Sequence, residues 1–271
     1  MKKFFIFLAA VSVLAACGGN PAVQEEDEHP KREDSQQQQT LKPEEAEEDS
    51  AVPDGTEKGE DTPQYRLNDQ YALEPISNAN PRVVLLTIDD APDQFALEMA
   101  KTLKKLDAPA IFFVNGHFLN SPDKEEMLKE IYDLGFYIGN HTYSHTDLTT
   151  LPEKKQKEEI LSVNEIVEKV TGEKPKFFRA PLGHNTDFSE QVVKEEQMLL
   201  MNWTYGYDWE PDYMTEDGIA DIMVNTPYLQ DGANLLMHDR EWTKDGLEQI
   251  VTGLRDKGYE IADPGLIQIN E

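Results

Sequence analysis

Short apolar runs alternate with amphipathic stretches over most of the chain. Residues 82–88 (RVVLLTI) form an apolar, β-branched run that predicts a buried strand ending in Asp89 and Asp90. Residues 93–106 follow, and their apolar side chains recur with the period of a helix. The same alternation predicts strands over 110–114, 137–139, 176–179, 198–203, 234–237 and 259–262, and helices over 124–134, 152–170, 189–195, 219–224 and 244–257.

Alternating strands and helices predict an α/β fold in which helices wrap parallel strands. Polar clusters follow directly after five of the predicted strands. Because the carboxyl ends of the strands share one face of a β/α barrel, we expect these clusters to converge on a single site. The clusters are Asp89 with Asp90, His141, Arg179, Asp208 with Trp209, and His238.

The first 16 residues differ from the rest of the chain. Two lysines precede an apolar stretch of about ten residues, which is too short to span a bilayer. This pattern predicts a secretory signal peptide over residues 1–16. Cys17 follows a Leu-Ala-Ala sequence, which resembles the signal of bacterial lipoproteins, whose cysteine is lipidated and becomes the new N-terminus. The alternative is an ordinary signal peptide followed by an incidental cysteine.

A polar, acidic stretch follows the cysteine. Residues 18–65 hold 15 acidic and four basic residues and almost no large apolar side chain. Such a stretch cannot bury enough surface to offset the entropy lost on ordering, so we expect a disordered tether over 17–65, beginning at the lipidated cysteine. Residues 66–271 then form one folded domain. We expect the protein to be anchored by lipid at the extracellular face of the cell membrane of a Gram-positive bacterium.

Composition excludes several classes of function. The formal net charge is −28, and nucleic-acid binding depends largely on basic side chains that contact phosphates, so no nucleic-acid partner is expected. The chain has one cysteine, which excludes an internal disulfide and a cysteine-based zinc site. Nothing in the sequence predicts a protein partner.

His141 and His145 have the H-x3-H spacing. Two imidazoles four residues apart can face one cation if the segment is helical or tightly turned. Histidines at this spacing also occur as ordinary surface or core residues, and paired acids after a strand often cap helices. Taken together, the two histidines and a carboxylate of Asp89 or Asp90 make a metal-binding set that leaves room for water. Successive side chains at a strand end point to different sides, so one aspartate can bind the metal while its neighbour faces the water.

Five short motifs occur in a fixed order between residues 82 and 265. They are Thr87-Ile88-Asp89-Asp90-Ala91-Pro92, His141-Thr142-x-x-His145, Arg179-Ala180-Pro181-Leu182-Gly183, Asp208-Trp209 and Leu235-Leu236-Met237-His238-Asp239. In these motifs the chain resembles the NodB-type polysaccharide deacetylases of carbohydrate esterase family 4, in a lipoprotein form. Such enzymes remove N-acetyl groups from peptidoglycan or chitin, or O-acetyl groups from xylan. The resemblance implies a distorted (β/α) barrel of seven to eight strands, the NodB homology or deacetylase fold.

The resemblance also implies a metal and a base. Asp90, His141 and His145 match the metal ligands. The usual ion in the family is zinc, and cobalt, nickel or manganese are alternatives because such a ligand set accepts several ions. Asp89 matches the general base, and Arg179 matches the residue that pairs with this base and orients it.

Further matches surround the acyl group. His238 matches the catalytic histidine, and Asp208 matches the acid that tunes it. Leu182 matches the residue whose backbone N–H donates to the oxyanion, and Pro181 precedes it in the same motif. Trp209 and Leu236 match the walls of the pocket for the acetyl methyl group.

These residue types suit the hydrolysis of an amide. A divalent ion lowers the pKa of its water towards neutrality and polarises the carbonyl. A carboxylate held by Arg179 stays ionised and can accept the proton of the water, and a histidine beside Asp208 can protonate the departing amine. One departure from the family pattern is Ala91, where glycine is usual. If that position needs a positive φ, alanine costs on the order of 1 kcal/mol.

Three functions compete at this point. The first is a metal-dependent deacetylase that removes N-acetyl groups from the amino sugars of cell-wall peptidoglycan. The second is the same chemistry on another acetylated glycan, namely a chitin oligomer, poly-N-acetylglucosamine or O-acetyl xylan. The third is a non-catalytic lipoprotein that binds glycan. Retirement of a catalytic site usually removes a ligand or an acid–base residue, and this chain has all of them.

Replacing Cys17 tests the predicted anchor. Because Cys17 is the chain's single cysteine, we expect Cys17→Ser to release the protein from the membrane fraction or to block its maturation. Fractionation of cells that express the two forms measures this. Unchanged membrane retention of the variant would mean that the apolar segment, and not a lipid, holds the protein.

Overall fold

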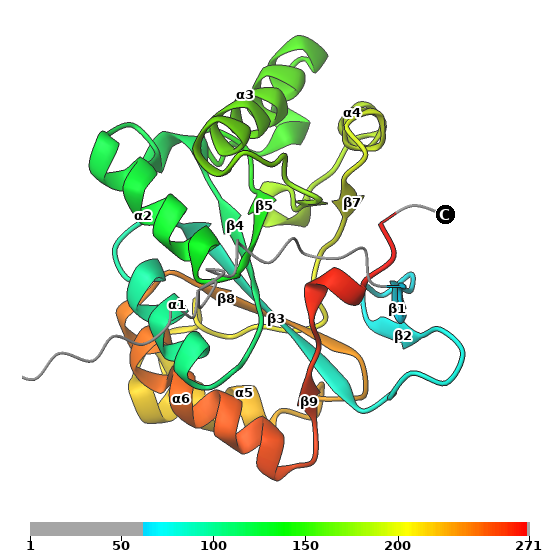
Figure 1. Cartoon of the computed structure of the whole chain (residues 1–271), viewed down its shortest axis with the longest axis vertical. Coiled ribbons are helices and arrows are strands. Elements are labelled where there is room, and N and C mark those ends of the chain that lie inside the picture. Colours follow the sequence, from blue (N-terminus) through cyan, green and yellow to red (C-terminus); the bar gives the residue numbers. More distant parts are fainter. Residues whose placement is uncertain (1–61, 270–271) are drawn as a thin grey trace, which may run out of the picture. The chain divides into compact units, whose positions relative to one another are not determined.

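Strand β3 (Val83–Ala91) runs through the middle of the main sheet in this computed structural model, which describes residues 62–269 (Figure 1). Its sequence, VVLLTIDDA, is buried at every position except Asp90, which is partly buried. A strand whose two faces are both covered has such a continuous apolar run. The predicted strand over 82–88 is therefore confirmed, and it continues through both aspartates.

The main sheet has seven strands within the described residues, and all of them pair in parallel. Parallel pairing brings the carboxyl ends of the strands to one side of the sheet. The strands lie in the order β7 (Leu199–Leu200), β6 (Phe177–Phe178), β5 (Tyr137–Asn140), β4 (Ile111–Val114), β3 and β8 (Ala233–His238), with β9 (Glu260–Ile261) paired to the start of β3.

Helices surround the sheet in the same order as the strands (Figure 1). Each helix contacts the next in the series α5, α6, α1, α2, α3 and α4, as expected when every strand is followed by a helix on the outside. The helices are α1 (Ala96–Lys105), α2 (Pro122–Asp133), α3 (Glu153–Thr171), α4 (Asp187–Glu195), α5 (Glu216–Asn225) and α6 (Glu241–Asp256). Short 3-10 helices are η1 (Gly116–Phe118), η2 (Leu148–Thr150), η3 (Pro181–Gly183), η4 (Pro211–Tyr213) and η5 (Pro264–Leu266).

The two faces of β3 pack into two different cores. Val84, Leu86 and Ile88 join a cluster with apolar residues of α1 and α6. Val83 and Leu85 point the other way and join a cluster with residues of β4 and β6. Side chains that alternate along a strand therefore fill both the layer under the helices and the inside of the curled sheet.

The segment after β7 curls the sheet towards closure. The backbone N–H of Met201 donates to the carbonyl of Phe178 in β6 at 2.9 Å. Tyr205 forms a parallel bridge with Leu235 of β8, at the opposite edge of the sheet. One short segment thus links both edges, and the predicted fold class, an α/β distorted barrel of seven to eight strands, is confirmed.

The hydrophobic pattern located the helices and the strands of the main sheet to within a few residues. It predicted no element before residue 82, where the structure has an antiparallel pair, β1 (Tyr65–Leu67) and β2 (Leu73–Pro75). Strands of three residues are too short to give a period along the sequence.

The structure leaves part of the N-terminal prediction outside its range. The signal peptide over 1–16, Cys17 and the tether up to residue 61 lie outside the described residues. Tyr65, the last residue of the predicted tether, is buried and begins β1. Within residues 62–269, no helix combines the length and apolar character needed to cross a membrane.

Candidate active site

An irregularity at the end of β3 sets the positions of two aspartates. The register between β3 and β4 shifts between Ile88 and Ala91, and Asp90 has a left-handed φ of 59°. Simple strand alternation predicts that Asp89 and Asp90 point to different sides, and here it is wrong because the left-handed residue interrupts the alternation. Both carboxylates approach Nε2 of His141, Asp89 through Oδ2 at 3.5 Å and Asp90 through Oδ1 at 4.0 Å.

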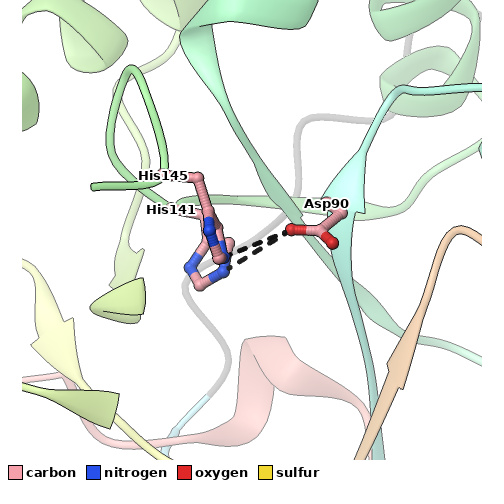
Figure 2. A group of neighbouring side chains, drawn as sticks. All are labelled: Asp90, His141 and His145. Atoms are coloured by element: carbon pink, nitrogen blue, oxygen red, sulfur yellow. Dashed lines mark ion pairs between the residues drawn. The ribbon is translucent and has the colours of Figure 1, made fainter. Parts of the chain in front are cut away.

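Asp90, His141 and His145 form a group that can hold a metal ion. One ligand atom from each residue lies within 4.8 Å of the other two, and Nε2 of His145 is 3.5 Å from Oδ1 of Asp90. Figure 2 shows both imidazoles, from the loop after β5, facing the Asp90 carboxylate at the end of β3. Ligand atoms on one tetrahedral zinc ion lie about 3–4 Å apart, so small shifts would bring these residues onto a single ion.

The loop after β5 is tightly turned and not helical. Thr142 and His145 have left-handed φ values of 66° and 59°. The side-chain amide of Asn115 donates to the carbonyl of His141 at 2.6 Å, and Oδ1 of Asn140 accepts from the backbone N–H of Thr142 at 2.9 Å. These buried asparagines hold the turn that brings the H-x3-H pair to one side.

Arg179 is fully buried beside the aspartates. Its Nη1 donates to Oδ1 of Asp89 at 2.7 Å and to Oγ1 of Thr87 at 2.8 Å. Its Nη2 donates to the carbonyl of Asn202 at 2.8 Å. The guanidinium therefore fixes one oxygen of Asp89 and leaves the other facing His141.

The backbone of Arg179 positions His141. Nδ1 of His141 lies 2.7 Å from the carbonyl oxygen of Arg179. Because a carbonyl only accepts, Nδ1 carries the proton and the lone pair of Nε2 is available to a metal. Burial lowers the pKa of His141, although the charge of Asp89 opposes this effect. The neutral imidazole is the form that binds metals.

His238, the last residue of β8, is held by Asp208. Nδ1 of His238 lies 2.7 Å from Oδ1 of Asp208, and the backbone N–H of His238 donates to Oδ2 at 2.6 Å. Oγ1 of Thr243 donates to the same Oδ2 at 2.8 Å. Burial disfavours protonation of His238, but the hydrogen bond and charge of Asp208, together with the charges of the two β3 aspartates, outweigh it and raise the pKa of His238.

Asp208 is not placed directly after a strand as predicted. Strand β7 ends at Leu200, and the chain then crosses to β8, where Tyr205 forms its bridge. Asp208 follows this crossing. The predicted strand over 198–203 was too long at its C-terminal end, because the residues after Met201 leave β6 to close the barrel.

Trp209 lies beside His238, and Leu236 lies two residues before it in β8. The Trp209 ring stands edge-on to the imidazole, with ring centroids 5.6 Å apart and an interplanar angle of 90°, and Trp209 is 42% exposed. Leu236 is buried in β8. The Leu236 carbonyl and the Trp209 ring both lie against Gly206, where a larger residue would not fit. A Cβ there would lie 2.5 Å from the carbonyl oxygen of Leu236 and 2.8 Å from the Trp209 ring.

Leu182 combines an unusual backbone with an exposed side chain. It lies in η3 after the buried Pro181, has a φ of 59°, and is 60% exposed. A left-handed leucine is rare, and such strained residues gather at functional sites. The structure thus gives Leu182 a fixed backbone orientation and leaves its side chain in solvent.

The backbone of Ala91 does not adopt the left-handed conformation in which glycine would be preferred. It is fully buried at the end of β3, and the left-handed residue is its neighbour Asp90. Alanine is therefore compatible with the backbone at this position.

Asp239 and Arg240, which directly follow His238, contact the two aspartates of β3. The sequence analysis assigned neither of them a role. Nη2 of Arg240 donates to Oδ2 of Asp90 at 2.7 Å. The Asp239 carboxylate accepts from the backbone N–H groups of residues 93–96 at 2.6–3.1 Å, which ties the start of α1 to the end of β8. Their place directly after a strand-end histidine was the available signal, but it does not show where the side chains reach.

Comparisons with known proteins identify a family. Residues 77–200 match the family model described as polysaccharide deacetylase. The chain is 31% identical over 195 residues to YlxY of Bacillus subtilis (strain 168), described as uncharacterized; the match covers 69% of this chain and 58% of YlxY. It is also 31% identical over 202 residues to the peptidoglycan-N-acetylmuramic acid deacetylase PdaA of the same strain, covering 71% of this chain and 74% of PdaA.

A solved structure supports the same fold. The wild-type CE4 family pseudoenzyme from Bacillus anthracis aligns with a TM-score of 0.62 at 27% sequence identity, covering 70% of this chain and 68% of the pseudoenzyme. Because a protein with this fold can be a pseudoenzyme, the completeness of the present site has to be judged from its own residues.

The two neighbouring aspartates should differ in their effect on metal binding. We expect Asp90→Asn to weaken the binding of Zn²⁺ or Co²⁺ by more than the roughly 10–100-fold typical of outer-shell changes, because it removes a charged ligand. Asp89→Asn should bind metal normally, since the new amide oxygen still accepts from Arg179. Equilibrium dialysis of both folded variants measures this, and the reverse order of affinities would contradict the assignment.

Proposed function

Because the chain belongs to the polysaccharide deacetylase family, we propose that this hydrolase removes N-acetyl groups from the amino sugars of cell-wall peptidoglycan with the help of a divalent metal. The observation that carries the proposal is one constellation: the group formed by Asp90, His141 and His145 lies beside an arginine-held Asp89. The name of PdaA supports peptidoglycan as the polymer.

Asp90, His141 and His145 would hold the metal, with zinc as the first choice and cobalt, nickel or manganese as alternatives. When bound, such an ion acidifies a water molecule and polarises the carbonyl of the acetyl group. The donor set of two imidazoles and one carboxylate is typical of hydrolytic metal sites that keep a position open.

Asp89 is the proposed general base. Arg179 holds Oδ1, and Oδ2 faces the side where His141 lies, so one oxygen is fixed while the other can accept a proton from the attacking water. The buried guanidinium holds this carboxylate in place.

His238 is the proposed general acid. The negative charge of Asp208 favours the imidazolium form, which can donate its Nε2 proton to the departing amine nitrogen. The amine must leave with a proton, because an amide anion is a poor leaving group.

The remaining matched residues would bind the acetyl group. The backbone N–H of Leu182, fixed by its left-handed conformation, is the proposed donor to the oxyanion. Trp209 beside His238 and Leu236 in the same strand as His238 would contact the acetyl methyl. Tyr143 lies between His141 and His145 in the sequence and is exposed, and we propose that its ring contacts a sugar.

A non-catalytic glycan-binding role is the second candidate, because a CE4 family pseudoenzyme shares the fold. Against it, the described chain contains the three candidate metal ligands, the arginine-held Asp89 and the His238–Asp208 pair, with His238 opposite Asp89 on the neighbouring strand. A site retired from catalysis has no need of this full set.

We also propose that lipid on Cys17 anchors the protein outside the cell membrane, where peptidoglycan is the nearest acetylated polymer. Two or three acyl chains give stable anchoring, whereas one chain gives only reversible binding. Cys17 and most of the tether lie outside the described residues, so this part of the proposal depends on the sequence alone.

Release of acetate tests the function directly. Incubation with peptidoglycan, chitin oligomers and acetyl xylan should release acetate from peptidoglycan, and removal of metal by a chelator should stop it reversibly. Asp89→Asn should lower the rate by about 10²–10⁴, the typical value of general acid–base catalysis. Analysis of the products for free glucosamine and muramic acid identifies the sugar. Near-normal turnover by Asp89→Asn would reject it as the base, and release of acetate only from another glycan would reject peptidoglycan as the substrate.

The pH dependence tests the role of Asp208. Because Asp208 raises the pKa of His238, the general acid should stay protonated to a higher pH than an ordinary histidine. The rate falls as pH rises through that pKa, so Asp208→Asn should move the alkaline limb of kcat against pH to lower pH. An unchanged alkaline limb, measured on a variant with the wild-type circular dichroism spectrum, would show that another group is the acid.

A further inference from the structure

The two carboxylate oxygens of Asp90 face different partners. Oδ1 is the atom that approaches the imidazoles, at 3.5 Å from Nε2 of His145 and 4.0 Å from Nε2 of His141. Oδ2 accepts a hydrogen bond from Nη2 of Arg240 at 2.7 Å. The carboxylate is therefore split between a side suited to a metal and a side held by a guanidinium.

Arg240 is itself fixed at the end of β8. Its Nη1 donates to the carbonyl of Asp239 at 3.0 Å, and its backbone N–H donates to the carbonyl of His238 at 2.8 Å. Strand β8 pairs in register with β3, where Asp89 lies opposite His238. The position of Arg240 just after β8 therefore places its guanidinium next to Asp90, and the Arg240 side chain is 37% exposed.

Each of the two neighbouring aspartates has its own arginine. Arg179 holds Oδ1 of Asp89 from inside the barrel, where it is fully buried. Arg240 holds Oδ2 of Asp90 from the solvent side. Because carboxylates on adjacent residues face the same histidine, separate anchors keep them from exchanging positions.

We propose that Arg240 is a positioning residue for the metal: it occupies Oδ2 of Asp90 and so presents Oδ1 alone to the ion. This inference depends on the metal-dependent function proposed above. A hydrogen-bonded ligand is already oriented before the ion arrives, which saves entropy on binding. With Oδ2 occupied, Asp90 contributes one donor atom, and the site keeps an open position.

A purely electrostatic role for Arg240 makes the opposite prediction. A guanidinium near a divalent ion repels it, so loss of the charge alone would tighten metal binding. Loss of an oriented ligand weakens metal binding, typically by 10–100-fold for groups of this kind. The sign of the change in affinity therefore separates the two roles.

The experiment uses the full chain and its Arg240→Ala and Arg240→Lys variants. The matched control is Arg66→Ala, which removes a guanidinium from another arginine–carboxylate pair, Arg66 with Glu74 in the β1–β2 hairpin. Competition with a chromophoric chelator gives the dissociation constants for Zn²⁺ and Co²⁺. The visible absorption of bound Co²⁺ reports its coordination number, because fewer ligands give more intense bands.

We expect Arg240→Ala to raise the dissociation constant by about 10–100-fold, because Asp90 is no longer oriented before the ion binds. The Co²⁺ bands should weaken, because the freed Oδ2 can become an additional ligand. Arg240→Lys, which keeps a cationic donor, should recover part of both, and it replaces the alanine variant if that one does not fold. Arg66→Ala should match the wild type.

Tighter or unchanged metal binding by Arg240→Ala would overturn the proposal, whatever the Co²⁺ bands show, and leave the metal-dependent function intact. A wild-type protein that binds neither ion would overturn the metal-dependent function itself, and with it this role of Arg240. The two failures are distinguishable because only the second affects the wild type.

Discussion

The site depends on one positive charge buried without access to water. A guanidinium inside a protein costs several kcal/mol unless it is paired, and Arg179 pairs its two terminal nitrogens with Asp89, Thr87 and the carbonyl of Asn202. Those partners come from β3 and from the segment that closes the barrel. The same residue's carbonyl fixes the tautomer of His141. Closure of the barrel, the position of the proposed base Asp89 and the tautomer of the proposed metal ligand His141 therefore all depend on this one buried guanidinium.

Left-handed backbone is the second constraint on the site. Asp90, Thr142, His145 and Leu182 have φ values of 59°, 66°, 59° and 59°. Each such residue costs on the order of 1–2 kcal/mol relative to the usual regions, although aspartate tolerates it better. Buried hydrogen bonds around these turns, such as that from Asn115, offset the cost. The site is thus held in conformations that the chain would not adopt on its own.

The sequence predicted the elements well because long apolar runs and helical periods are local signals. It placed Asp89, His141, Arg179 and His238 at strand ends, and the structure finds them there. It failed where position depends on tertiary contacts. The residues after Leu200 have the apolar pattern of a continuing strand, but the chain crosses to β8, so Asp208 lies in a loop. Alternation failed at Asp90 because one left-handed residue reverses it. Arg240 could not be assigned, since its partner lies 150 residues away.

The order of the strands has a consequence for how the protein matures. Asp90, His141 and His145 lie on or just after β3 and β5, which flank β4 and are made early, whereas His238 and Arg240 arrive with β8 near the end of the chain. Contacts between such distant segments slow folding, because the intervening chain must be ordered first. Until β8 docks, the apolar edge of β3 stays unpaired and able to recruit strands from other molecules. The last quarter of the sequence thus decides both protection from aggregation and completion of the proposed catalytic groups.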